Sequence, residues 1–230
     1  MQSIAKDIPK ALLPAGSQTF IDWQLQWLRL LGVSEVIMAL GHRGDLIEKY
    51  LQTKTSLIYP KIKFSYDGSS PLGTGGAVKR AITHLQEDFL VAYGDSFLFI
   101  NLVKLMRTHV KAKNPVTFSI MKNQNIGDTS NVTYRNGQMF YDKFNITPDM
   151  EFIDYGMSVF SKNYFIKNSP EGTFDLAQFV TQACKDQRIT PFVVNEPFYE
   201  TGSVEGYEIF KNFIESNTNL RKLATEKGII

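Results

Sequence analysis

The chain has 230 residues, 43% of them hydrophobic, with 25 basic and 23 acidic side chains and a formal net charge of +2. This length and composition suit one α/β domain, and the balanced charge argues against binding to a nucleic-acid backbone or to an anionic membrane. No run of eighteen uncharged apolar residues occurs, the amino terminus has no signal-peptide pattern, and a single cysteine, Cys184, leaves no internal disulfide. We therefore expect a cytoplasmic protein with a small charged ligand, in which Cys184 is a buried apolar thiol.

The first half of the chain alternates helices with strands. Residues 18–31 place their large apolar side chains on one side of a helix, and Gly32 ends it. The apolar runs EVIMAL, KIKFSY and FLVAYG are predicted strands, separated by the helical segment LIEKYL and by a helix at about 76–85. This alternation predicts a parallel, doubly wound sheet of the nucleotide-binding kind.

The second half of the chain has a different pattern. After a helix near NLVKLMRTHVKAK and the strand VTFSIM, the dipeptide Asn136-Gly137 favours a hairpin between two short strands. FIDYGMSVF is a predicted strand, a helix spans about 173–187, and SVEGYEIFKNFIES forms a closing helix. Because no linker is present, we expect a single domain over 1–230, with halves of about 1–125 and 126–230.

Two glycine-containing segments carry candidate chemistry. SPLGTGGAVKRA places three glycines and a threonine between a strand and a helix, so that backbone can approach a ligand closely. For such a loop taken alone, a tight turn that only starts a helix is the more common explanation. FLVAYGDSFL ends in Gly94-Asp95 at the carboxyl edge of a strand, where open α/β sheets bind ligands. A carboxylate there suits Mg²⁺, and the alternative is that Asp95 caps a following helix.

Three further segments contain isolated charged residues. In PKALLP, Lys10 lies between two prolines that are predicted to hold the chain extended, so its ammonium can point at a phosphate; the alternative is a solvated surface lysine. MFYDKFN places Lys143 after Asp142 on a short strand, and YETGS places Glu200 before a turn and a helix. Taken singly, these segments have weak specificity.

Six motifs together are far more specific than any one of them. PKALLP, PLGTGGA, GDS, YDK, IDYG and YETGSVEG occur in an order and spacing that resemble the sugar-1-phosphate nucleotidylyltransferase (sugar-nucleotide pyrophosphorylase) family over essentially the whole chain. The likeness is to the branch of mannose-1-phosphate and D-glycero-D-manno-heptose-1-phosphate guanylyltransferases. It implies a Rossmann-like nucleotidyltransferase fold, with a mixed, mainly parallel central sheet flanked by helices and a small antiparallel substrate lobe. It also implies magnesium dependence and cytoplasmic synthesis of nucleotide sugars for surface polysaccharide.

The resemblance assigns roles to individual residues that bind the nucleotide and its metal ion. Lys10 matches a lysine that contacts the nucleotide phosphates, and Asp95 matches a magnesium ligand. Glu200 stands where many relatives carry a second metal ligand, an aspartate, so its arm is longer than in those relatives. The loop that holds the base corresponds to Leu72, Gly73, Thr74 and Gly75.

On the sugar-phosphate side, Lys143 matches a lysine that contacts the phosphate of the sugar. Asn131 and Asp142 lie in segments that border the sugar, and Gly156 offers backbone close to it. For the neighbouring Tyr155, a role in the site and packing in the core are equally good explanations. The residues with catalytic roles are then Lys10, Asp95 and Lys143.

The activity implied by the resemblance is transfer of a nucleoside monophosphate from a nucleoside triphosphate to a sugar 1-phosphate, with release of pyrophosphate. The attacking phosphate is already ionised at neutral pH, so catalysis depends on positioning and on charge neutralisation rather than on a general base. One sequence does not define the base, the sugar or the oligomeric state. A glycosyltransferase is a weaker interpretation, because GDS does not supply the Asp-x-Asp motif of those enzymes.

One part of the family pattern has no counterpart in these 230 residues. Relatives begin with an apolar strand and a loop of the form G-G-x-G-T-R, just before the position of Met1. Because such a loop cradles the triphosphate, we expect the natural protein to extend upstream of Met1 and the 230 residues alone to be impaired. The alternative is a catalytically impaired sugar-nucleotide-binding or regulatory module that lacks the phosphate loop.

Overall fold

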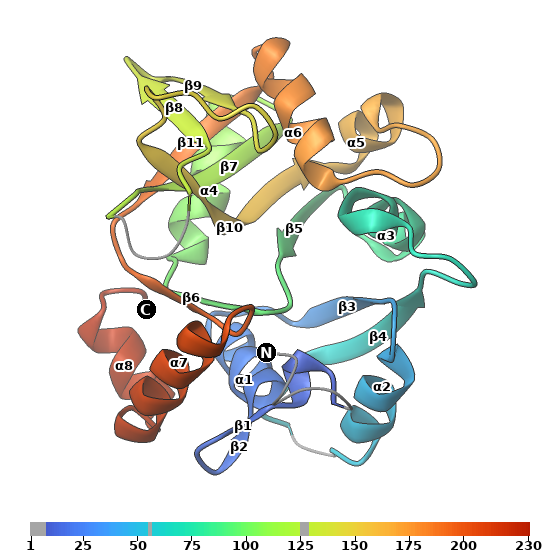
Figure 1. Ribbon diagram of the computed structural model, residues 1–230, viewed down its shortest axis with the longest axis vertical. Helices are drawn as coiled ribbons and strands as arrows, with labels where there is room; N and C mark the ends of the chain where they lie inside the picture. Colours follow the sequence, from blue (N-terminus) through green and yellow to red (C-terminus); the bar gives the residue numbers. More distant parts are fainter. Residues whose placement is uncertain (1–7, 55–56, 125–128) are drawn as a thin grey trace. The chain divides into compact units, whose positions relative to one another are not determined.

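The computed structural model describes residues 8–54, 57–124 and 129–230 (Figure 1). Its internal contacts divide the chain into two compact units that are interleaved along the sequence. Unit 1 comprises Met1–Gly68, Tyr93–Asn101 and Pro197–Ile230, and unit 2 comprises Ser69–Ala92 and Leu102–Glu196. These boundaries do not coincide with a division near residue 125, and a single domain over 1–230 stays a prediction.

Unit 1 contains two short antiparallel pairs of strands, one parallel pair and four α-helices within its described residues. Strands β3 and β4 are parallel, whereas β1 pairs with β2 and β6 pairs with β12 in antiparallel fashion. The elements are η1 Lys10–Leu12, β1 Pro14–Ala15, β2 Gln18–Thr19, α1 Phe20–Leu30, β3 Glu35–Leu40, α2 Gly44–Gln52, β4 Lys61–Tyr66, β6 Ser96–Leu98, β12 Phe198–Glu200, α7 Val204–Ser216 and α8 Leu220–Glu226.

Helix α1 is the centre of unit 1. Thr19 and Asp22 form a capping box at its start, and Gly32, with φ +94°, follows its end. The buried side of the helix carries Phe20 and Trp27, which contact aromatic rings of β6 and α7 at centroid distances of 4.9 Å (Phe20 to Phe210) and 5.4 Å (Trp27 to Phe97). Aromatic packing therefore ties the predicted helix 18–31 to segments that are distant in sequence.

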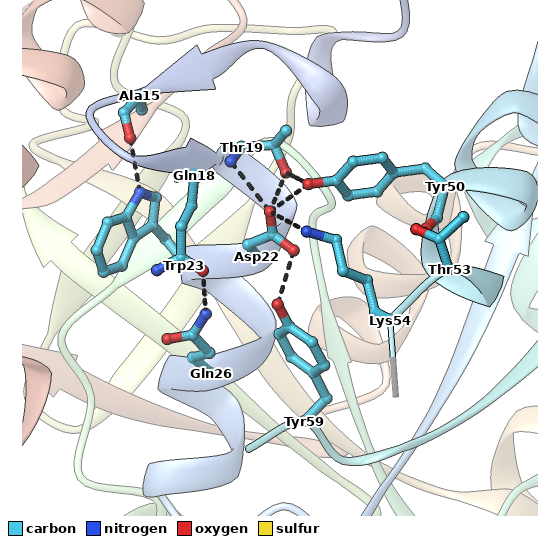
Figure 2. Close-up of polar contacts among 10 residues, drawn as sticks. All are labelled: Ala15, Gln18, Thr19, Asp22, Trp23, Gln26, Tyr50, Thr53, Lys54 and Tyr59. Carbon is cyan, nitrogen blue, oxygen red and sulfur yellow. Dashed lines mark hydrogen bonds and ion pairs between the residues drawn. The ribbon is translucent and has the colours of Figure 1, made fainter. Parts of the chain in front are cut away.

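A fully buried carboxylate lies on another side of α1 (Figure 2). Asp22 accepts hydrogen bonds from the Thr19 N–H (3.1 Å), the Thr19 hydroxyl (2.8 Å) and the hydroxyls of Tyr50 and Tyr59, and it is 3.5 Å from Lys54 Nζ. Burial raises the pKa of Asp22, but the hydrogen bonds from Tyr50 and Thr19 lower it by more, so the net pKa lies below its ordinary value. This network joins α1 to the end of α2 and to the segment before β4.

Unit 2 is built on a six-stranded sheet with the order β11-β7-β10-β8-β9, in which β5 also pairs with β10. Figure 1 shows the β8–β9 hairpin at one end of this unit. The elements are α3 Gly73–Ala81, η2 Ile82–His84, β5 Asp88–Ala92, α4 Leu102–Ala112, β7 Val116–Lys122, β8 Val132–Arg135, β9 Gln138–Tyr141, β10 Phe152–Ser161, α5 Lys162–Asn168, α6 Leu176–Lys185 and β11 Ile189–Val194.

Helices cover both faces of this sheet, as the continuous burial of β7 requires. Val116, Phe118 and Ile120 of β7 belong to the apolar cluster that α6 completes. The alternate residue Thr117 instead forms a 2.9 Å hydrogen bond, through its hydroxyl, with the His109 ring of α4. Successive residues of a strand point to opposite faces, so α6 and α4 lie on opposite sides of β7. None of the helices in the described part of the chain is long and apolar enough to cross a membrane.

The strands and helices expected from periodicity are largely present, but the balance of strand directions differs. EVIMAL and KIKFSY are β3 and β4, and the hairpin at Asn136-Gly137 joins β8 to β9. In the described residues, however, only the pairs β3–β4 and β7–β11 are parallel, so the expectation of a mainly parallel sheet is not met. The reason is β10, which runs antiparallel to β5, β7 and β8 and is buried on both faces.

Candidate functional site

The predicted site residues fall into two groups, one in each unit. The group in unit 1 contains Lys10, Asp95 and Glu200, which are separated by up to 190 positions in the sequence. The group in unit 2 contains Leu72, Gly73, Thr74, Gly75, Asn131, Asp142, Lys143 and Gly156. Each group is described by itself below.

Asp95 lies in the turn that leads into β6. No helix follows it directly, because β6 begins at Ser96 and α4 begins only at Leu102, so the alternative that Asp95 caps a helix is wrong. Antiparallel pairing places Ser96 opposite Glu200, and the Thr201 N–H donates to the carbonyl oxygen of Asp95 at 2.9 Å. Strand pairing thus brings the GDS motif beside the ETGS motif.

The two carboxylates of these motifs face the same side of Gly202. A methyl group built on Gly202 would lie 2.7 Å from Glu200 Oε2 and 3.5 Å from Asp95 Oδ2. Only a residue without a side chain leaves this space open between the two carboxylates. Asp95 and Glu200 are both partly exposed, so the space is accessible to a small ligand.

Lys10 completes this group, although its backbone differs from the expected conformation. Pro9 is extended, but Lys10 begins the 3₁₀ turn η1, closed by hydrogen bonds from the N–H of Leu12 to Pro9 O (2.8 Å) and of Leu13 to Lys10 O (3.0 Å). Both donors are present because the second proline of the motif comes only at position 14, after Leu12 and Leu13. A proline at either of those two positions would remove a donating N–H. The Lys10 ammonium is exposed and donates to Gly202 O at 3.0 Å, beside the carboxylate pair.

Two residues of α1 that the sequence did not single out hold the Asp95 turn. The Gln24 side-chain amide donates to Tyr93 O at 3.0 Å and to Ser96 O at 2.8 Å, so it binds the backbone on both sides of Asp95. Trp27 Nε1 donates to Leu98 O at 2.7 Å. From the sequence, Gln24 and Trp27 are only members of an amphipathic helix. Their hydrogen bonds reach residues about seventy positions away, which local pattern does not predict.

Glu200 is held against the start of α7. The Ser203 N–H donates to its Oε2 at 2.9 Å, and the Ser203 hydroxyl donates to its Oε1 at 2.5 Å. A methyl group on Gly206 would lie 1.8 Å from the same Oε1, so the carboxylate fills the place of a side chain there. The longer arm of glutamate therefore folds onto the helix amino terminus, where a negative charge is stabilised.

The chemistry of this group fits a hard divalent cation. Mg²⁺ prefers oxygen ligands, and one or two protein carboxylates suffice when substrate phosphates supply the rest. Asp95 Oδ2 and Glu200 Oε2 meet that requirement, since both approach the side of Gly202. Among the residues that the structure describes, no three His, Cys, Asp or Glu side chains are grouped to bind a metal.

In unit 2, the glycines of PLGTGGA allow a close internal approach. Gly73 has φ +72°, and a methyl group on it would lie 2.5 Å from Phe174 O, while one on Gly75 would lie 2.1 Å from the Phe174 ring. The Gly75 N–H donates to Phe174 O at 3.0 Å, and the Phe174 N–H donates to Leu72 O at 3.0 Å. The glycine pattern is therefore explained by packing on Phe174, and the role of Leu72 to Gly75 in binding a base stays a prediction.

Asp175, the residue after Phe174, connects two predicted site residues. Its Oδ1 accepts hydrogen bonds from the Thr74 hydroxyl (3.1 Å) and the Ala177 N–H (2.9 Å), and its Oδ2 is 3.4 Å from Lys143 Nζ. Burial raises the pKa of Asp175, but the bond from Ala177 and the charge of Lys143 lower it by more, so the net pKa is below its ordinary value. From the sequence, Asp175 is only one residue of the helix predicted at about 173–187.

Lys143, Asp142 and Asn131 lie in one loop region of unit 2. Lys143 follows β9 in a turn, not on the expected short strand, because the Asp142 carboxylate accepts from the N–H groups of Phe144 (2.8 Å) and Asn145 (3.0 Å). A hydrogen bond from the Asn145 side chain, followed by these two backbone bonds, lowers the pKa of Asp142. Asn131 O accepts from the Asp142 N–H at 3.1 Å. Asp142 thus shapes the turn that presents Lys143.

Gly156 lies in an irregular part of β10. The pairing with β7 shifts between Asp154 and Ser158, and Gly156 has φ +96° there. Asn131 Oδ1 accepts from the Asp154 N–H (3.0 Å), and Asp154 Oδ1 accepts from the Gly156 N–H (2.9 Å). Asn131 and Gly156 are therefore part of one connected bulge, while contact of either with a sugar stays a prediction.

Other residues weighed from the sequence are structural. Cys184 is buried in α6, and burial raises its pKa to about 12, as expected for an apolar thiol. Tyr155 is almost fully buried, which supports core packing. His109, in the last turn of α4, is also buried, with ring nitrogens 2.9 Å from Thr117 Oγ1 and 3.4 Å from Asp88 Oδ1.

The two units are built from β-strands and α-helices in a mixed α/β fold, and comparison with known proteins gives the family. The profile described as nucleotidyl transferase matches residues 1–130, so the chain belongs to the nucleotidyl transferase family. The D-glycero-alpha-D-manno-heptose 1-phosphate guanylyltransferase of Campylobacter jejuni is 26% identical over 210 residues, which cover 91% of this chain and 92% of that protein. The enzyme of the same name from Aneurinibacillus thermoaerophilus is 23% identical over 210 residues, 90% of each chain.

Solved structures of the same kind share the fold. The crystal structure of HddC from Yersinia pseudotuberculosis has a TM-score of 0.78 and 20% identity, and 93% of each chain is covered. The structure of HddC complexed with GMP-PN has a TM-score of 0.76 over the same shares. The family and the Rossmann-like α/β fold class predicted from six ordered motifs are confirmed.

Proposed function

We propose that this protein joins a nucleoside monophosphate to a sugar 1-phosphate and releases pyrophosphate, with guanosine triphosphate and a heptose or mannose 1-phosphate as substrates. The relatives from Campylobacter jejuni and Aneurinibacillus thermoaerophilus carry that activity in their names, and the HddC complex contains a guanine nucleotide analogue. The product is an activated sugar made in the cytoplasm for surface polysaccharide.

The observation that carries the proposal is the convergence of Lys10, Asp95 and Glu200 around Gly202. Three motifs far apart in the sequence supply one exposed ammonium, bonded to Gly202 O, and two carboxylates that face the same glycine. Opposite charges at one small, open space suit a nucleotide phosphate with its cation.

In the proposed reaction, an oxygen of the sugar 1-phosphate forms a bond to the α-phosphorus of the nucleotide, and the bond from that phosphorus to the pyrophosphate oxygen breaks. Asp95 and Glu200 would hold Mg²⁺, which neutralises charge on phosphate oxygens when bound. Lys10 offers a positive charge to the nucleotide phosphates, and Lys143 offers one to the phosphate of the sugar. No side chain needs to remove a proton, because the attacking phosphate is already ionised.

The test is pyrophosphate release by the full-length protein with Mg²⁺, measured across nucleoside triphosphates and sugar 1-phosphates. We expect turnover with guanosine triphosphate, and we expect Asp95→Asn to lower kcat about 100-fold, a typical cost of removing one such electrostatic group. Glu200→Gln should lower it less, since Ser203 already engages that carboxylate.

The matched control is Asp45→Asn, which removes an exposed carboxylate of α2 in the same unit. It should leave kcat unchanged. Equal rates for the parent and Asp95→Asn would remove Asp95 from the mechanism. Nucleotide binding with no pyrophosphate release for any sugar 1-phosphate would contradict the proposal and would fit a binding or regulatory module instead.

A further inference from the structure

We propose that Asp175 is a positioning residue that connects the nucleotide loop of unit 2 to Lys143, so that one carboxylate fixes Thr74 with one oxygen and holds the sugar-phosphate lysine with the other. This inference rests on the proposed function, because the role of Lys143 is part of it, and on the predicted role of Thr74 in the nucleotide loop. Asp175 lies outside all six motifs that the sequence carries.

The two oxygens of Asp175 have separate partners. Oδ1 accepts from the Thr74 hydroxyl and the Ala177 N–H, whereas Oδ2 is directed at Lys143 Nζ. The Thr74 hydroxyl itself accepts a 2.8 Å hydrogen bond from the Leu176 N–H, so its orientation is fixed from both sides. Thr74 is thereby fastened to the start of α6, from which Asp175 reaches Lys143.

The surrounding contacts fix Asp175 firmly to the Thr74 loop but leave Lys143 free to move. Backbone hydrogen bonds join residues 72–76 to Phe174, and Lys79 Nζ is 2.7 Å from Glu171 Oε1, so α3 and the segment before α6 are tied at several points. Lys143 is 52% exposed and has a 3.4 Å ion pair with Asp175. A half-exposed lysine held by one carboxylate can turn to a phosphate without losing a buried contact.

Asparagine at position 175 separates the two halves of this role. It keeps an oxygen for Thr74 and Ala177 and remains a good helix cap, but it presents an uncharged group to Lys143. A residue that only caps α6 would therefore tolerate Asp175→Asn in every assay. A positioning residue for Lys143 would not.

The experiment compares the parent, Asp175→Asn and Asp186→Asn in the pyrophosphate-release assay. Asp186→Asn is the charge-matched control, since Asp186 is an exposed carboxylate at the end of the same helix, bonded to Gln182. We expect Asp175→Asn to raise the KM for mannose 1-phosphate or heptose 1-phosphate about fivefold, the scale of one partly exposed ion pair. The dissociation constant for guanosine triphosphate and the melting temperature should stay at the parent values, as should all constants of Asp186→Asn.

A second variant shows whether Asp175 acts through Lys143. In a Lys143→Met background, Asp175→Asn should have no further effect on the KM for the sugar 1-phosphate. A further increase would mean that Asp175 contacts the sugar itself, and the positioning role would be wrong. An unchanged KM for Asp175→Asn in an active parent would also overturn the inference while leaving the proposed function intact.

A readout that needs no turnover covers the remaining case. If the parent releases no pyrophosphate with any substrate pair, the proposed function fails, and ¹³C NMR titration of the Asp175 carboxyl group still tests the connection. Lys143→Met and Thr74→Val should each raise the pKa of Asp175, because both partners lower it in the parent. A pKa that neither substitution moves would show that the carboxylate does not bridge the two residues.

Discussion

Asp22 in unit 1 and Asp175 in unit 2 have the same kinds of partner but different surroundings. Each lies at the start of a helix, bonds a threonine hydroxyl and pairs with a lysine. The Asp22 side chain is 0% exposed and two tyrosine hydroxyls complete its shell, whereas the Asp175 side chain is 34% exposed. A carboxylate with threonine and lysine partners therefore has a structural role at Asp22, where tyrosine hydroxyls replace water. At Asp175, where no tyrosine among the described residues does so, the carboxylate stays accessible to a ligand.

The largest effect expected from this comparison is on stability. Asp22→Ala would leave two tyrosine hydroxyls, a backbone N–H and Lys54 without their acceptor, at a cost of about 3 kcal/mol in the free energy of unfolding. Asp175→Ala should cost about 1 kcal/mol, the usual value for a lost helix cap. Urea unfolding followed by tryptophan fluorescence and circular dichroism measures both, and equal losses would break the comparison.

The next effect concerns the packing beneath Asp175. Gly75→Ala would place a methyl group 2.1 Å from the Phe174 ring, so Phe174 must move, and we expect a loss of about 2 kcal/mol. Gly94→Ala is the matched control, because no atom lies within 4 Å of the added methyl group. If Gly75→Ala were as stable as Gly94→Ala in thermal unfolding, packing on Phe174 would not explain the glycine.

A smaller effect separates the two threonines. Thr19→Val removes a hydroxyl that donates to the buried Asp22 and should cost about 1 kcal/mol, whereas Thr74→Val should cost less in stability because Asp175 is partly open to water. The second substitution should instead weaken nucleotide binding, measured by calorimetry. A reversed order of the two stability losses would contradict the assignment of Asp22 as the structural carboxylate.

The pH dependence of stability gives the smallest effect, since burial opposes the hydrogen bonds that lower the pKa of Asp22. A carboxyl group whose folded pKa is below its unfolded value stabilises the protein above the unfolded pKa, here 3.8, and this contribution is lost as the pH falls through the folded pKa. Urea midpoints measured from pH 6 to pH 3 should therefore fall less steeply for Asp22→Ala than for the parent. Parallel curves would show that the pKa of Asp22 is the same in both states.

Local pattern predicted much of the fold but not its long-range connections. β3, β4 and the β8–β9 hairpin follow from apolar runs and from Asn136-Gly137, since these features act over a few residues. The short strands β6 and β12 were not predicted, because each has three residues and is defined only by its partner. The direction of β5 was missed for the same reason, as it depends on β10 about seventy positions later.

The candidate site divides in the same way. Lys10, Asp95 and Glu200 were predicted from motifs, and strand pairing brings the last two together. Gln24 and Asp175 were missed, because each lies within a helix that local pattern predicts without reference to any distant partner. Their partners, Tyr93, Thr74 and Lys143, are found only in three dimensions.

The interleaving of the two units has a consequence for synthesis on the ribosome. Unit 2 is complete in sequence once Glu196 has been made, whereas unit 1 also needs Pro197–Ile230. Until α7 emerges, Phe20 of α1 and Phe97 lack the ring of Phe210, which lies 4.9 and 5.4 Å from them in the folded protein. The unit that contains α1 is thus completed after unit 2, and a ribosome that stalls before α7 leaves an apolar helix face exposed to chaperones and proteases.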